Sequence, residues 1–113
     1  MRHSGPDKDL IRTELLKCAH ARPMEILFYS DFAPRVKMSA RGPWKKVLDE
    51  ISREETEKGL PDITFLLKRK STGYPGQIDF KKAETPDIQQ KLRAREKLQE
   101  VIDKYNCGSL NPY

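Results

Sequence analysis

Basic side chains gather in two short stretches of the sequence, and their types suit phosphate binding. Residues 35–46 hold five basic groups, one serine and no acid, and three consecutive basic residues at 68–70 precede a tyrosine at 74. Lys and Arg neutralise phosphates, a serine hydroxyl can hydrogen-bond to one, and a tyrosine ring can stack on a base. The candidate nucleic-acid-binding residues are Arg35, Lys37, Ser39, Arg41, Lys45, Lys46, Lys68, Arg69, Lys70 and Tyr74.

Two alternatives stand beside this interpretation. The basic side chains equally fit an ordinary solvated surface, and a tyrosine beside proline in a turn often packs as a cap. If the stretches do bind DNA, Arg41 is the best candidate for a base contact, because it lies at the start of a predicted helix. The N-terminal residues of a helix in the major groove commonly contact base edges.

A third pattern concerns carboxylates. Pro61-Asp62 followed by Asp79-Phe80-Lys81 fits the PD-(D/E)xK arrangement of nucleases, in which carboxylates hold Mg²⁺ and a lysine polarises water or phosphate. That spacing is easily met by chance, and the structural alternative makes Asp62 the residue after a helix stop and Asp79 an outward strand residue. We therefore rank a Mg-dependent nuclease below a non-catalytic protein with no cofactor and no metal.

Composition limits the class of protein. The 113 residues suit a single domain, and the net charge of +5 makes a polyanionic partner plausible. Cys18 and Cys107 with His3 and His20 form no convincing zinc set. The sequence has no long apolar run and no apolar signal-peptide core, so we expect no membrane partner and a cytoplasmic location.

The stretch 41–74 organises the chain around one helix. Gly42 is expected as its N-cap, Pro43 as its first residue and Gly59 as its left-handed end. A helical apolar stripe, with Trp44 as the core anchor, follows in Trp44, Val47, Leu48 and Ile51.

Charge divides this helix into a basic start and an acidic second half. The acidic half must point away from phosphate if the start meets DNA, or it can face a protein partner. As a solvated surface it would instead form the pairs Glu50–Arg53 and Glu54–Lys58 along the helix.

Further elements are expected on both sides of the central helix. The spacing of Ile11, Leu15, Cys18 and Ala19 predicts a helix over 7–21, a strand follows at 25–29, and Ser30 caps a short helix over 31–36. Strands are predicted at 63–67 and 78–80 around a basic loop. A last helix over 86–105, capped by Thr85, has Ile88 and Leu92 at the start of its apolar face.

This order predicts an α+β fold, a winged helix-turn-helix-like domain with a C-terminal helix. The winged-helix-like core covers 1–82, the C-terminal helix 83–106 and a tail 107–113. The basic loop is then the wing. The last helix closes the core or pairs with a second subunit as a homodimer.

Two resemblances accompany this prediction. The chain resembles a small uncharacterised bacterial protein family, and the similar motifs are Tyr29-Ser-Asp-Phe-Ala33, Leu48-Asp-Glu-Ile-Ser52, Gly59-Leu-Pro-Asp-Ile-Thr64 and Thr72-Gly-Tyr-Pro-Gly76. It is also loosely similar to the winged-helix DNA-binding domain of alkylguanine alkyltransferase-like proteins. Because Leu60-Pro-Asp-Ile-Thr64 lacks their catalytic cysteine and histidine, this resemblance implies the domain shape and no alkyl transfer.

Together these features predict a non-catalytic protein, regulatory or accessory, that binds double-stranded DNA through a basic helix-turn-helix and wing. The alternative is a protein–protein interaction module, a small inhibitor or accessory subunit. Its partner would dock on the C-terminal helix or on the acidic half of the central helix.

Overall fold

Helix α1 (Lys8–His20) opens the part of the chain that the computed structural model describes, which is residues 7–78 and 86–113. The Asp7 side chain caps it by accepting a hydrogen bond from the Leu10 amide at 3.1 Å. Its predicted inner face is confirmed, since the buried residues are Ile11, Leu15, Cys18 and Ala19.

Strand β1 (Leu27–Phe28) leads directly into a compound helix. Helix α2 (Tyr29–Phe32) continues without a break into the 3₁₀ helix η1 (Ala33–Val36). Ser30 therefore lies inside the helix, and Phe28 occupies the cap position that the sequence had assigned to Ser30. The strand ends at Phe28, so the helix begins at Tyr29, two residues earlier than predicted.

Helix α3 (Trp44–Glu57) begins one residue later than predicted, with Pro43 at the N-cap. Trp44 is the expected core anchor: it is buried, and its indole N–H donates to the carbonyl of Ala40 at 2.9 Å. The C-terminal end is confirmed, because Gly59 has a φ of 75° and the Leu60 amide donates to the Glu55 carbonyl at 2.9 Å.

The predicted strand over 63–67 is mostly a 3₁₀ helix, η2 (Ile63–Leu66). Asp62 starts this helix by accepting a hydrogen bond from the Thr64 amide at 3.0 Å. All residues from 63 to 67 are buried, so alternation between two faces, the basis of the strand prediction, does not describe the segment. Strand β2 (Leu67–Lys68) then pairs in parallel with β1, with Leu67 opposite Leu27.

The loop after β2 closes on itself. The Arg69 amide donates to the Tyr74 carbonyl at 3.0 Å, and the Gly73 amide donates to the Arg69 carbonyl at 2.8 Å. The 3₁₀ helix η3 (Gly76–Ile78) follows where the sequence predicted the approach to a returning strand. Most of that strand, 79–80, lies outside the described residues, and within the described ranges no antiparallel hairpin is formed.

Helix α4 (Ile88–Tyr105) begins with a capping box between Asp87 and Gln90; the predicted cap, Thr85, lies outside the described residues. Its buried face is Ala94, Leu98, Val101 and Ile102. Ile88 and Leu92, predicted on that face, are instead 66% and 46% exposed, because the first turns of α4 extend past the core.

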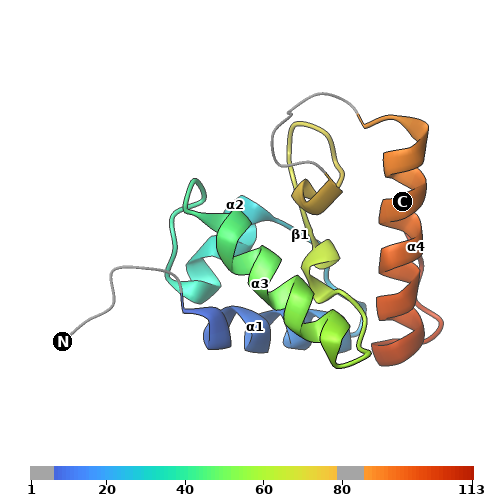
Figure 1. Ribbon diagram of the computed structural model, residues 1–113, viewed down its shortest axis with the longest axis horizontal. Coiled ribbons are helices and arrows are strands. Elements are labelled where there is room, and N and C mark those ends of the chain that lie inside the picture. Colours follow the sequence, from blue (N-terminus) through green and yellow to red (C-terminus); the bar gives the residue numbers. More distant parts are fainter. Residues whose placement is uncertain (1–6, 79–85) are drawn as a thin grey trace.

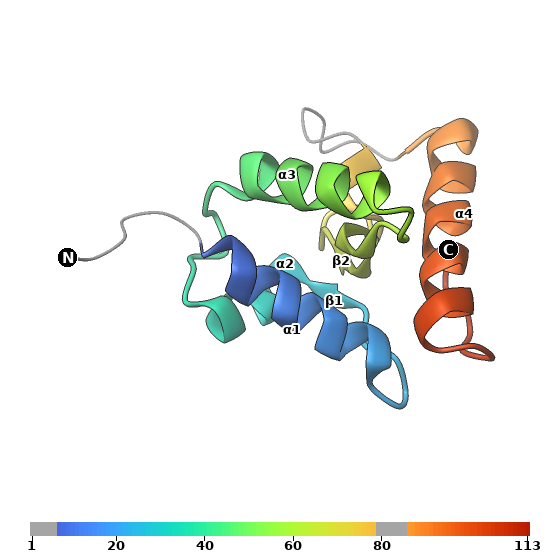
Figure 2. The same cartoon turned by 60° about the horizontal axis from the view of Figure 1, so that its bottom comes forward.

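Figure 2 shows α1 and α3 lying side by side, with α4 across the C-terminal ends of both. The described residues thus form a mixed fold, mainly helical, with one small two-stranded parallel sheet. In this described portion no helix is both long enough and apolar enough to cross a membrane.

Candidate functional site

The turn before α3 presents basic side chains to solvent. Ser39 shapes it: its hydroxyl accepts from the Arg41 amide at 3.1 Å, and its carbonyl accepts from the Gly42 amide at 2.9 Å. A Cβ at Gly42 would lie 2.8 Å from the Met38 methyl carbon and 3.0 Å from the Ser39 carbonyl oxygen, so a larger residue here would have to displace the Met38 side chain and would lie tightly against the backbone. Arg41 is exposed at the tip of this structure.

The first turn of α3 continues this basic surface. Lys45 and Lys46 are exposed, and Lys45 forms an ion pair with Asp49 at 2.6 Å. Its first turn has no acidic residue, and within the described residues no side chain caps its amides. The positive end of the helix dipole therefore adds to the lysine charges. We call Arg41, Lys45 and Lys46 the basic end of α3; Lys37 is exposed at the C-terminal end of η1.

The second half of α3 is bound to α1. Lys8 pairs with Glu54 at 2.6 Å and with Glu50 at 3.5 Å. Arg12 pairs with Glu54 and, through its Nε, with the buried Glu55 at 3.3 Å. The hydrogen bond from Lys8 is the main cause that lowers the pKa of Glu54 below its usual value.

The sequence had paired Glu50 with Arg53 and Glu54 with Lys58, and both pairings are wrong. Glu50 and Glu54 bind Lys8 of α1, whereas Lys58 pairs with Glu55 at 3.6 Å. The spacing within one helix could not reveal this, because the cations come from a segment some forty residues earlier. The consequence is that Glu54 and Glu55 are held by α1, whereas Glu50 pairs with Lys8 and also lines a hollow on the outward side of α3.

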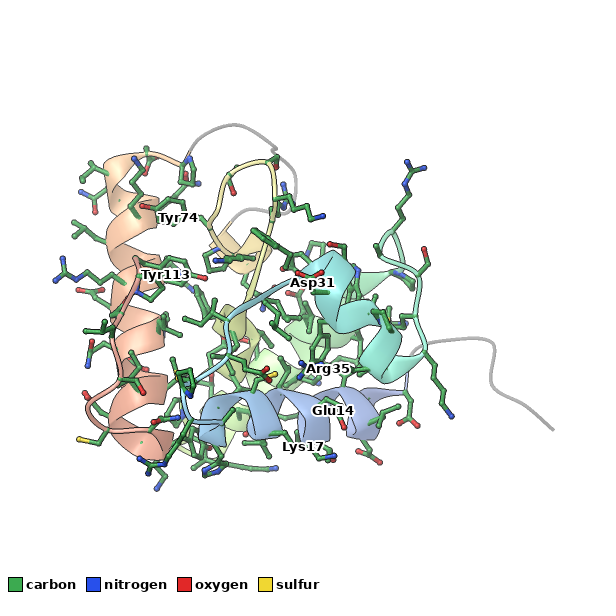
Figure 3. All side chains as sticks on the ribbon, turned by 180° about the vertical axis from the view of Figure 1, so that it is seen from behind. Glu14, Lys17, Asp31, Arg35, Tyr74 and Tyr113 are labelled. Atoms are coloured by element: carbon green, nitrogen blue, oxygen red, sulfur yellow. The ribbon has the colours of Figure 1, made fainter. Side chains whose placement is uncertain are left out.

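The basic loop packs around aromatic rings. The ammonium groups of Lys68 and Lys70 lie 4.9 Å and 5.9 Å from the ring centre of Phe28. Tyr74 stacks on Tyr113 of the C-terminal tail at 5.4 Å, so its ring packs within the protein as a cap. Figure 3 shows these two tyrosines side by side.

Tyr29 connects the two basic stretches. Its ring centre lies 5.5 Å from that of Trp44, and its hydroxyl interacts with the backbone of Gly76. Burial raises the pKa of Tyr29 above its usual value. The Tyr29 side chain thus contacts both the start of α3 and the end of the loop. Figure 1 shows the turn before α3 and the loop after β2 on the side of the molecule away from α1.

Arg35 lies apart from this surface. Its guanidinium pairs with Glu25 at 2.8 Å, and this hydrogen bond lowers the pKa of Glu25. The same Nη1 lies 3.6 Å from the Sγ of Cys18, whose pKa burial raises to about 11. In Figure 3 Arg35 lies against α1 near Glu14, away from Tyr74.

Asp62, the first carboxylate of the nuclease pattern, makes contacts that are typical of a structural residue. It is buried, and it accepts hydrogen bonds from the hydroxyls of Ser52 and Thr64 as well as from the Thr64 amide. Gln77 donates to the Thr64 hydroxyl at 2.9 Å. Asp79 and Lys81 lie outside the described residues, and within those residues no group of three or more His, Cys, Asp or Glu side chains is placed to hold a metal.

The candidate residues from the sequence include only two of the six that line a hollow on the outward surface. This hollow along α3 is lined by Pro43, Lys45, Lys46, Asp49, Glu50 and Arg53. Asp49 and Arg53 lie one and two turns beyond Lys45 and Lys46, so helical spacing applied to the exposed side would have found them. A neighbouring hollow includes Lys8, which the sequence alone gave no reason to associate with α3.

No family model, curated protein or solved structure matches this chain. The bearing of the site on function therefore comes from the geometry of its own residues.

Proposed function

We propose that this protein binds double-stranded DNA without catalysis, in a regulatory or accessory role, through the basic end of α3 and the loop after β2. The observation that carries the proposal is the separation of charge on α3. Glu50, Glu54 and Glu55 are bound by basic side chains, while Lys46 and Arg41 remain exposed at the uncapped start. A helix with this arrangement can approach phosphates with its N-terminus while these three acids are engaged by basic side chains.

The finer fold belongs to the same proposal. The compound helix α2–η1, the turn over 37–43 and α3 would form a helix-turn-helix. The loop closed between Arg69 and Tyr74 would act as the wing. The resemblance to the DNA-binding domain of alkyltransferase-like proteins favours the same arrangement, in a chain without their catalytic cysteine.

Fluorescence anisotropy with a labelled random duplex, at low and at near-physiological salt, tests the proposal. We expect micromolar binding that weakens steeply as salt rises, because each phosphate neutralised releases a condensed counterion. An absence of binding even at low salt would overturn the proposal.

A matched pair of variants separates this surface from general basicity. Lys45→Ala and Lys17→Ala each remove one charge from an exposed lysine that has an acidic partner on its own helix. Lys17 lies on α1 and is labelled in Figure 3, which shows the molecule from the side opposite to Figure 1. We expect Lys45→Ala to weaken DNA binding and Lys17→Ala to leave it nearly unchanged; equal losses would indicate non-specific attraction.

An interaction module is the second candidate, favoured by one observation on α4. Ile88 and Leu92 lie one turn apart and are 66% and 46% exposed. Two apolar side chains on one exposed helix turn can dock a protein. If the protein forms a stable complex that Ile88→Ser with Leu92→Ser abolishes, and binds no duplex, this candidate replaces the first.

A further inference from the structure

The side chains of α3 fall into three rows. The inner row, which includes Leu48 and Ile51, is buried in the core. A flanking row carries Glu50 and Glu54, which are bound by α1. The outward row lies along the surface hollow and comprises Lys45, Lys46, Asp49 and Arg53, while Pro43 and the flanking Glu50 complete the lining of that hollow.

Asp49 is the unusual member of the outward row. Its side chain is 48% exposed, and its partner is Lys45 on the preceding turn, at 2.6 Å. Glu50 also lines the hollow but is paired with Lys8 of α1, whereas the partner of Asp49 belongs to the basic surface itself. A carboxylate facing phosphates would weaken binding, so this position suits a base edge better than the DNA backbone.

The chemistry of base edges gives Asp49 a specific partner. In the major groove, cytosine presents its N4 amino group as a donor, and an Asp carboxylate accepts from it. The groove is wide enough to admit an α-helix, and residues near the N-terminus of that helix reach the bases. Asp49 lies in the second turn of α3, within that part of the helix.

We infer that the outward row of α3 faces base edges in the major groove and that Asp49 selects a cytosine there. This inference rests on the proposed function and makes the binding sequence-selective. Lys45 orients the carboxylate through its ion pair, and the other basic members of the row hold the adjacent phosphates.

The test is selection of preferred duplexes from a random library by the wild-type protein, by Asp49→Asn and by Glu57→Gln. Asn has nearly the same shape as Asp but reads adenine instead of cytosine. Glu57 is a matched control, because it is an exposed acid on the last turn of the same helix, 68% exposed and outside the hollow.

We expect the wild-type protein to prefer cytosine at one position by about tenfold over the other bases. Asp49→Asn should lose that preference and favour adenine at the same position. Glu57→Gln should tighten binding to all sequences slightly and keep the cytosine preference.

Failure of the proposed function can be distinguished from failure of this inference. If the wild-type protein binds no duplex, the proposed function falls and this inference falls with it. If it binds without any base preference, or if Asp49→Asn selects the same sequence with the same ratio, DNA binding stands and the role of Asp49 is overturned.

Discussion

The two ends of α3 belong to one continuous helix and have opposite environments. At its start, Lys46 is exposed and the amides lack a side-chain cap among the described residues. In its second half, Glu55 is 2% exposed and lies 3.3 Å from the Arg12 guanidinium. One end is exposed and the other is built into the core, and the difference comes from α1, whose Lys8 and Arg12 pair with the acids of the second half.

This contrast shows how a helix with five acidic and three basic side chains can still present basic charge at one end. Glu50, Glu54 and Glu55 are matched by Lys8, Arg12 and Lys58, whereas Glu57 stays exposed, 4.0 Å from Arg53. The charges at the start have no comparable set of counter-charges, apart from the pair of Lys45 with Asp49. A net surface charge of this kind steers polyanions toward one end of the helix.

The largest expected effect is at the buried end. Arg12→Ala removes the guanidinium that lies closest to the buried Glu55 carboxylate. We expect the free energy of unfolding to fall by about 3 kcal/mol, the low end for breaking a buried pair, because Lys58 still lies 3.6 Å from Glu55.

Urea denaturation measures this change. Arg53→Ala is the control, since Arg53 is exposed on the outward side of the same helix and should change stability by less than ~0.5 kcal/mol. Equal effects from the two arginines would mean that the buried end is no more dependent on its charges than the exposed surface.

The next effect is on DNA binding at the exposed end. Arg41 is exposed at the tip of the turn before α3, so Arg41→Ala should leave stability nearly unchanged. We expect duplex affinity to fall about tenfold, within the range for the loss of one specific arginine contact. Anisotropy titrations measure this affinity, with Lys17→Ala as the control. If Arg41→Ala binds duplex as tightly as wild type, the proposed position of the DNA surface is wrong.

Acidification should affect the buried end selectively. Lys8 and Arg12 lower the pKa of Glu54, so the folded protein binds the proton more weakly than the unfolded chain. This contribution to stability is present above the usual pKa of Glu and is lost as pH falls through the lowered value. Denaturation at a series of pH values should show a shallower acid loss for Glu54→Gln than for wild type, and identical slopes would contradict the pairing.

The helices and their inner faces could largely be predicted from the sequence. Periodicity located the buried stripes of α1 and α3, and Gly59 marked the end of α3 correctly. The helix ends shifted by one or two residues, as at Ser30 and Pro43, because local caps compete with neighbouring turns.

What the sequence could not supply was contact between distant segments. The strand prediction at 63–67 failed because Asp62 starts a 3₁₀ turn in a segment buried on all sides. Parallel pairing of Leu27 with Leu67 crosses forty residues and leaves no local pattern. The candidate site divides in the same way: the lysines were visible in the sequence, whereas the docking of Glu54 on α1 and of Tyr74 on Tyr113 was not.

The smallest expected effect tests whether the lysines at the exposed end contact phosphates. Lys45 pairs with Asp49, but its side chain is 61% exposed, so Lys45→Ala should cost less than ~0.5 kcal/mol of stability. If Lys45 neutralises a phosphate in the complex, the variant should bind all duplexes more weakly, and the slope of log affinity against log salt should fall by about 1. A weaker affinity with an unchanged slope would mean that Lys45 acts by orienting Asp49. An unchanged affinity would mean that DNA meets the exposed end through Arg41 and Lys46 alone, with the Lys45–Asp49 pair intact beside it.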